Sequence, residues 1–168
     1  MARTNRDQSL TTPKDSLIKF NKDLGNKFKA GVGLKFLEEY INQDIIETSL
    51  KSFLEKNALK QTSTIEFEDY IKSKTEKDID WFFTDYVNTR KKIDYKIDDV
   101  EKSDDSIRFT IKNKRDSNVP ISLFTFDKDS LISKTWISNI EDKKRYTLPI
   151  GNTNKIVLNN DNIIPEYK

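Results

Sequence analysis

The sequence predicts an α+β fold, with an N-terminal α-helical subdomain followed by an antiparallel, immunoglobulin-like β-sandwich. Before residue 92 the apolar residues recur at intervals of three and four, and after it they alternate with polar residues. Ten Phe, six Tyr and two Trp supply large apolar groups for cores, although 35% of the 168 residues are charged. We divide the chain into a lead-in loop (1–13), a helical subdomain (14–91) and a β-sandwich domain (92–168).

The first helices are predicted from start signals and apolar spacing. Residues 1–13 are polar and end in Thr-Thr-Pro, which favours a helix over 14–24 with Leu17, Phe20 and Leu24 on one face. A second helix is expected over 26–42, where apolar residues on two sides indicate packing between neighbours.

The stretch "NKFKAGVGLKFLEEYI" places Gly31 and Gly33 inside this second helix. Each glycine costs on the order of 1 kcal/mol relative to alanine in a helix interior. We therefore expect the backbone to approach another element closely at this place.

Three more helices complete the predicted helical subdomain. One covers 43–58, and the next starts at an N-cap of Ser63 or Thr64. The last starts at Asp78 and aligns its apolar residues on one face: Ile79, Phe82, Phe83 and Tyr86. Short loops predict antiparallel neighbours.

The strands are predicted from alternating apolar residues between turn signals. The segments that alternate are "IDYKIDDVE", "SIRFTIKN", "VPISLFTFD", "LISKTWI", "RYTLPI" and "KIVLN". Turns are expected at 104–105, 116–118, 127–129, 141–142 and 151–152. Six or seven short strands at this spacing are typical of a small sandwich.

Charge and composition exclude several classes of function. The net charge is only +2, and the basic runs at 90–92 and 143–145 are interpreted as solvated turns, so nucleic acid is not an expected partner. No stretch approaches the roughly 18 apolar residues of a membrane span. The absence of Cys and His excludes disulfides, His-based acid–base catalysis and His-containing zinc sites within this chain.

Three short motifs, in this order, carry a resemblance to a known family. They are Phe28-Lys29-Ala30-Gly31 with Leu34 and Leu37, then Thr64-Ile65-Glu66-Phe67, then the aromatic segment from Asp78 to Tyr86. The order resembles the part of zinc aminopeptidases of the membrane alanyl aminopeptidase type (gluzincin clan) that follows the zinc motif. The resemblance spans roughly residues 26–100 and is strongest to bacterial, envelope-associated members. A β-sandwich follows these helices in that family.

The resemblance implies which residues face the substrate cleft. Phe28, Lys29 and Gly31 match the segment that begins beside the active site, so we expect them to face the cleft. The family's tyrosine at the position of Phe28 stabilises the oxyanion, and phenylalanine lacks that hydroxyl. No catalytic or metal-binding residue is assigned in this chain, and no cofactor is expected in it. The zinc implied for the parent enzyme would be bound by His-Glu-x-x-His and a further Glu outside it.

Other chemically suggestive residues have simpler interpretations. Trp81, Phe82 and Phe83 could line a substrate pocket, but core packing is the favoured interpretation. We expect at least two of the aromatic residues from Trp81 to Tyr86 to contact either the sandwich or the helix that begins at Phe28. Asp78, Asp80 and Asp85 are interpreted as helix-capping and surface charges rather than a cation site.

Two functions follow as alternatives. The first is a non-catalytic fragment of a zinc metallopeptidase that forms part of the cleft wall and an accessory sandwich. Its partners would be the remainder of the parent peptidase and, in the parent, a peptide substrate. This chain alone is predicted to be inactive. The alternative is a free-standing helical and immunoglobulin-like module that binds protein or peptide. The sequence does not fix the localisation, although the resemblance points to a bacterial cell envelope.

Overall fold

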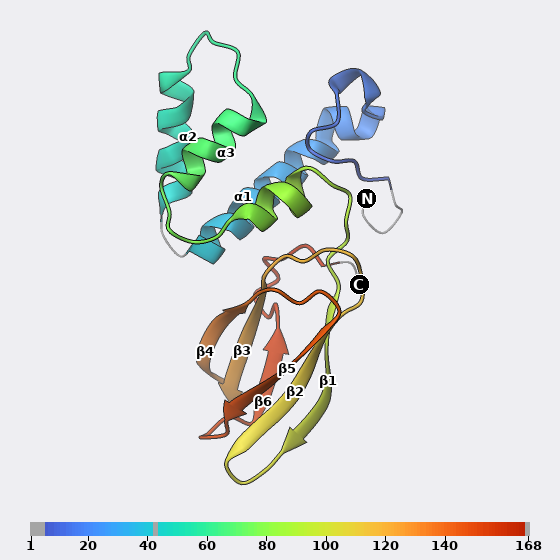
Figure 1. The fold of residues 1–168 in the computed structure, drawn as a ribbon, viewed down its shortest axis with the longest axis vertical. Helices are drawn as coiled ribbons and strands as arrows, with labels where there is room; N and C mark the ends of the chain where they lie inside the picture. The colour runs from blue at the N-terminus through green and yellow to red at the C-terminus, as the bar shows by residue number, and fades with distance from the viewer. Residues whose placement is uncertain (1–5, 42–43, 167–168) are drawn as a thin grey trace. The chain divides into compact units, whose positions relative to one another are not determined.

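The computed structural model describes residues 6–41 and 44–166 of the chain. These residues form an α+β protein with two compact units, one over Arg6–Arg90 and one from Lys91 onward (Figure 1). The first unit is helical and the second contains two antiparallel three-stranded sheets. The predicted change from helical to strand patterns near residue 92 is confirmed.

The helical unit is built from α-helices, π-helical turns and one short 3₁₀ turn. Its elements are η2 (Lys14–Ser16), η3 (Asn21–Gly25), α1 (Asn26–Ile41), α2 (Ile45–Lys56), α3 (Thr64–Lys72) and η4 (Phe82–Val87). Its buried apolar residues lie on all the longer elements: Phe36, Leu37, Ile41, Ile46, Phe53, Ile71, Ile79, Trp81, Phe82, Phe83, Tyr86 and Val87.

The predicted helix over 14–24 is only partly correct, because residues 19–24 are helical but residues 17–18 are not. Only the 3₁₀ turn η2 forms near its start, and η3 runs without a break into α1. Asn21 explains where the helix is anchored, because its buried side-chain amide donates to the Arg6 carbonyl and to Gln8 Oε1 at 2.8 and 2.9 Å. These bonds hold the polar lead-in segment beside η3. Of the apolar residues predicted to share one face, Phe20 and Leu24 are exposed.

The start of α3 was predicted correctly. The Ser63 hydroxyl accepts from the Glu66 backbone N–H, and the Glu66 carboxylate accepts from the Ser63 backbone N–H at 2.7 Å. This reciprocal capping box satisfies two N–H groups that have no partner within the helix. For the helix predicted over 43–58, residue 43 lies outside the described residues, and α2 begins at Ile45.

An aromatic cluster joins η4 to α1. The Trp81 ring lies 4.6 Å from the Phe36 ring and 5.3 Å from the Tyr40 ring, and the Tyr86 ring lies 6.4 Å from Phe36. Phe82 stacks on Tyr86 at 5.6 Å. Trp81, Phe82 and Phe83 are therefore core residues, and the prediction that at least two of these aromatics contact the helix containing Phe28 is confirmed.

The second unit contains six strands in two sheets. The strands are β1 (Tyr95–Lys102), β2 (Ser106–Asn113), β3 (Ile121–Asp127), β4 (Ser130–Ile137), β5 (Lys143–Pro149) and β6 (Lys155–Leu158). One sheet has the order β1-β2-β5 and the other the order β4-β3-β6, and all pairs are antiparallel. The predicted strands and the turns between them are confirmed, with β1 starting two residues after Ile93.

Because apolar and polar residues alternate along the strands, the apolar core of this unit lies between the two sheets. Ile107, Phe109 and Ile111 are fully buried on β2, and Leu123 is buried on the central strand β3. Tyr95 fixes the loop between β2 and β3, because its hydroxyl lies 3.0 Å from the Ser117 carbonyl and 2.8 Å from the Val119 carbonyl.

Candidate functional site

The first candidate site is an exposed apolar face on the helix formed by η3 and α1. Phe20, Leu24, Phe28 and Val32 recur every four residues, and their exposed fractions range from 39% to 64%. We call these four residues the exposed stripe. The predicted packing of this helix between neighbours is not found on this face among the described residues. An apolar face of this size on a helix is normally covered by another element or a partner.

The two glycines of α1 have different surroundings. Gly33 is buried, and a Cβ atom at this position would overlap the Tyr86 ring. Gly31 has open space where its Cβ would lie, with no atom of the described residues within 4 Å beyond its own helix backbone and chain neighbours. The predicted close approach of the backbone therefore holds at Gly33, and the element that approaches is η4.

Lys29 connects three parts of the helical unit. Its amino group donates to the Gln8 carbonyl at 3.2 Å and to the Thr89 carbonyl at 3.1 Å, and lies 5.7 Å from the centre of the Tyr86 ring. The Tyr86 hydroxyl donates back to the Lys29 carbonyl at 2.8 Å. Burial of the phenol raises the pKa of Tyr86 well above its ordinary value. The Lys29 side chain therefore has a structural role on this helix.

The three residues predicted to face the cleft have distinct environments. Phe28 belongs to the exposed stripe at 64% exposure, and Gly31 is exposed, whereas the Lys29 amino group is held by backbone carbonyls. All three lie in the first six residues of α1. Whether they face a cleft stays a prediction.

The acidic residues near η4 have structural partners. Asp78 accepts from the Asp80 backbone N–H at 3.0 Å, as expected for a cap, and Asp80 pairs with Lys72 at 2.7 Å. Within residues 6–41 and 44–166, no group of three or more Asp, Glu, His or Cys side chains is arranged to hold a metal ion. No helix in the same residues is long and apolar enough to cross a membrane.

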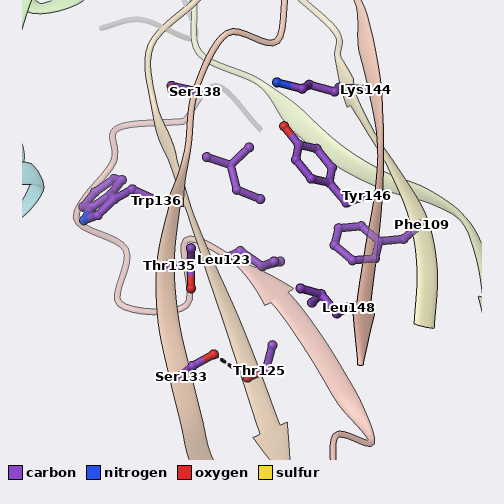
Figure 2. A pocket seen from close by; sticks show the side chains of 11 residues that line it. Phe109, Leu123, Thr125, Ser133, Thr135, Trp136, Ser138, Lys144, Tyr146 and Leu148 are labelled. Atoms are coloured by element: carbon purple, nitrogen blue, oxygen red, sulfur yellow. Dashed lines mark hydrogen bonds between the residues drawn. The ribbon is translucent and has the colours of Figure 1, made fainter. Parts of the chain in front are cut away.

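A second candidate site is a pocket of about 320 Å³ in the sheet unit. Strands β2 to β5 all contribute to its walls, and the residues that line it are Phe109, Leu123, Thr125, Ser133, Thr135, Trp136, Ile137, Ser138, Lys144, Tyr146 and Leu148. Figure 2 shows Phe109, Tyr146 and Leu148 facing Leu123, while the Trp136 ring points away. No sequence pattern predicted this pocket.

The polar groups of the pocket lie mainly on β4 and β5. The hydroxyls of Ser133 and Thr125 are hydrogen-bonded at 2.7 Å (Figure 2). The Tyr146 hydroxyl is buried and has no hydrogen-bond partner among the described residues. Burial raises the pKa of Tyr146, whose ring stacks on Phe109 at 5.8 Å. The Lys144 amino group lies 5.7 Å from the Tyr146 ring centre.

Comparison with known proteins gives a structural match only. The chain matches no protein-family model and no curated protein sequence. It does resemble solved structures, among them Legionella pneumophila aminopeptidase A in complex with aspartic acid. The match has a TM-score of 0.59 and 13% sequence identity, and covers 83% of this chain but only 17% of that protein. The likeness shows a shared fold. An aminopeptidase-like fold is thus suggested for the chain, which spans less than a fifth of the matched protein.

Proposed function

We propose that this chain is a non-catalytic part of a zinc metallopeptidase of the aminopeptidase family. The observation that carries the proposal is the fold match, which covers 83% of this chain and a limited part of an aminopeptidase A. The ordered motifs from Phe28 to Tyr86 independently support the membrane alanyl aminopeptidase type, within the gluzincin clan and of bacterial origin. On this proposal, the six-stranded unit is an immunoglobulin-like accessory sandwich.

The exposed stripe supports the proposal that this chain is part of a larger enzyme. Its four apolar side chains occupy one face of a helix whose opposite side is already packed against η4. Because each side chain is already about half covered, burying the rest of it would contribute on the order of 1 kcal/mol. We propose that the remainder of the parent peptidase covers part of this face and that α1 forms part of the cleft wall. The exposed positions of Phe28 and Gly31 are compatible with that wall.

The residues present do not fit catalytic zinc. Such sites normally have three protein ligands, and the related enzymes use histidine, which this chain lacks. No alternative cluster of ligands occurs in the described residues. The zinc motif of the proposed parent would therefore be outside this chain. Phe28 lacks the hydroxyl that the resemblance implies for oxyanion stabilisation, so we assign no catalytic step to this chain.

Association with the preceding part of the peptidase tests the proposal. The flanking coding sequence should contain His-Glu-x-x-His, and its product should bind this chain when the two are co-expressed. Replacing Leu24 and Phe28 with Glu should abolish the complex. Leu54→Glu is the control, because Leu54, at 67% exposure, is at least as exposed as Leu24 and Phe28 but lies on α2 outside the stripe. A stop codon and ribosome-binding site just before Met1 would contradict the proposal and favour the free-standing module.

The purified chain offers a second test. We expect no tightly held zinc after dialysis and no cleavage of aminoacyl fluorogenic substrates. One equivalent of zinc per chain, together with activity that a chelator removes, would refute the assignment as a non-catalytic part.

A further inference from the structure

The pocket of the sheet unit is bordered by an edge strand from each of the two sheets. Among the described residues, strand β5 pairs only with β2 in its sheet, and β4 pairs only with β3 in the other. Both edge strands contribute lining residues, including Tyr146 on β5 and Thr135 on β4. An edge strand retains backbone N–H and C=O groups directed away from its sheet. The pocket therefore combines apolar walls with backbone groups suited to pair with an added strand.

Strand β4 leaves room in the pocket because two residues of its inner face, Ser133 and Thr135, have small hydroxyl side chains, although the third, Ile137, is apolar and buried. Ser133 and Thr135 pair with Thr125 and Leu123 and line the pocket, whereas the Trp136 ring points away from it (Figure 2). Most sandwiches place apolar side chains on the inner face and polar ones outside. The reversal on β4 leaves space between the sheets that an incoming side chain could fill.

The charge at the pocket favours an acidic ligand. Lys143, Lys144 and Arg145 are consecutive exposed residues on β5, and Lys144 lines the pocket itself. Among the described residues that line the pocket, none is acidic. The basic residues and Pro149 also make β5 a poor edge for strand addition. Strand β4 contains no proline, so it is the better edge.

We propose that this pocket binds an extended acidic peptide, which adds to β4 as a further strand. Alternate side chains of a strand point to the same side, so an aliphatic residue of the peptide would enter between Leu123 and Leu148. An acidic residue of the peptide would then lie near Lys144. The buried Tyr146 hydroxyl could donate to an oxygen of the peptide, since it has no partner in the described residues. This inference does not depend on the peptidase relationship.

The first test uses the wild-type chain and a fluorescein-labelled peptide, Asp-Thr-Leu-Thr-Leu-Thr-Asp, in an anisotropy titration. We expect micromolar affinity that weakens as the salt concentration rises, because exposed charges are screened. Two further peptides have the same side chains but are N-methylated at alternate backbone nitrogens, one at the odd-numbered and one at the even-numbered positions. Each has lost half of the N–H donors, and the one that has lost the donors facing β4 should bind at least tenfold more weakly. Equal affinity of all three peptides would overturn strand addition.

Variants of the chain locate the site. Thr135→Phe fills the pocket from β4 and should abolish binding, whereas Thr147→Phe adds the same ring at an exposed position of β5 that does not line the pocket. Lys144→Glu should weaken binding at least fivefold, with Lys112→Glu on β2 as the charge-matched control. Circular dichroism confirms that each variant retains its strands. Undiminished binding by Thr135→Phe would place the peptide elsewhere and overturn the inference.

Two other occupants are distinguished in the same experiments. Hexanoate carries an aliphatic body and a carboxylate but no backbone donors, so binding of hexanoate without binding of the peptide would identify a small-molecule site. A dimer that forms without peptide and is lost in Thr135→Phe would identify a second copy of the chain as the occupant. Either result would overturn the proposal of a peptide strand.

Discussion

Adding one methyl group to each glycine of α1 should change stability in opposite directions. At Gly33, the new Cβ would overlap the Tyr86 ring, which is confined by Phe36 and stacked on Phe82. At Gly31, the same Cβ would enter open space. Gly33→Ala should therefore destabilise the helical unit, and Gly31→Ala should stabilise it.

The expected magnitudes follow from three contributions. Replacing a helical glycine with alanine contributes about 1 kcal/mol of stability at either position. Overpacking at Gly33 costs about 1–3 kcal/mol. If the Tyr86 ring moves, its hydroxyl also loses the 2.8 Å bond to the Lys29 carbonyl, at a further cost of about 1 kcal/mol. The net loss for Gly33→Ala is about 1–3 kcal/mol, against a gain of up to about 1 kcal/mol for Gly31→Ala.

Urea denaturation followed by circular dichroism at the helical band measures both changes. The two variants must be compared at equal slopes of free energy against urea concentration, because a changed slope means that the unfolded or native state has changed. Tyr86→Phe separates the hydrogen bond from the packing, since it removes only the hydroxyl. If Gly33→Ala is as stable as Gly31→Ala, the close packing of η4 on α1 does not exist and the reasoning fails.

Three further predictions concern single side chains. Tyr95→Phe should cost about 1–3 kcal/mol because it removes the hydroxyl that donates to the Val119 carbonyl, although the Ser117 carbonyl still accepts from the Asn113 side chain. Tyr146→Phe should cost less than about 0.5 kcal/mol in urea unfolding of the sheet unit. Equal losses of stability in the two variants would contradict the finding that the Tyr95 hydroxyl is hydrogen-bonded and, among the described residues, the Tyr146 hydroxyl is not. Ser63→Ala should cost about 1 kcal/mol. The Ser63 backbone N–H, and then its hydroxyl, lower the pKa of Glu66, so the contribution of the bonds to the Glu66 carboxylate is present above the ordinary pKa of 4.5 and is lost as the pH falls through the lowered value. The bond that the Ser63 hydroxyl accepts from the Glu66 backbone N–H does not titrate. A difference between wild type and Ser63→Ala that grows in acid would contradict this. In an intact parent enzyme, Phe28→Tyr should raise kcat more than it lowers KM, and a change confined to KM would show that the hydroxyl does not act on the transition state.

Local sequence signals predicted those elements whose causes are local. The capping box at Ser63 and Glu66 depends on residues three positions apart, and the strands depend on alternation within a few residues. The predicted helix start at residue 14 was wrong because a Thr-Thr-Pro start signal is compatible with a single 3₁₀ turn, and the helix begins only at residue 19. The anchor of the real helix is the contact of Asn21 with Arg6 and Gln8, which no periodicity reveals.

The candidate sites depend on contacts between distant parts of the chain, which the spacing of apolar residues does not reveal. Apolar spacing identified the face that includes Phe28, but spacing does not say whether anything covers it. The partner of Gly33 is Tyr86, a contact between elements far apart in the chain. The pocket was missed because Ser133 and Thr135 interrupt the apolar alternation. That interruption, with Trp136 in the opposite phase, is the signal that could have indicated a space between the sheets.

The contacts of Lys29 also determine when the helical unit can form during synthesis. Its amino group bonds to Thr89, 60 residues later, and its carbonyl accepts from Tyr86, 57 residues later. A ribosome adds about 5–20 residues per second, so α1 waits several seconds for the residues that complete its packing. During that interval its apolar residues are accessible to chaperones. Translational pausing shortly after Thr89 emerges would therefore favour correct folding, and pausing before it would prolong exposure.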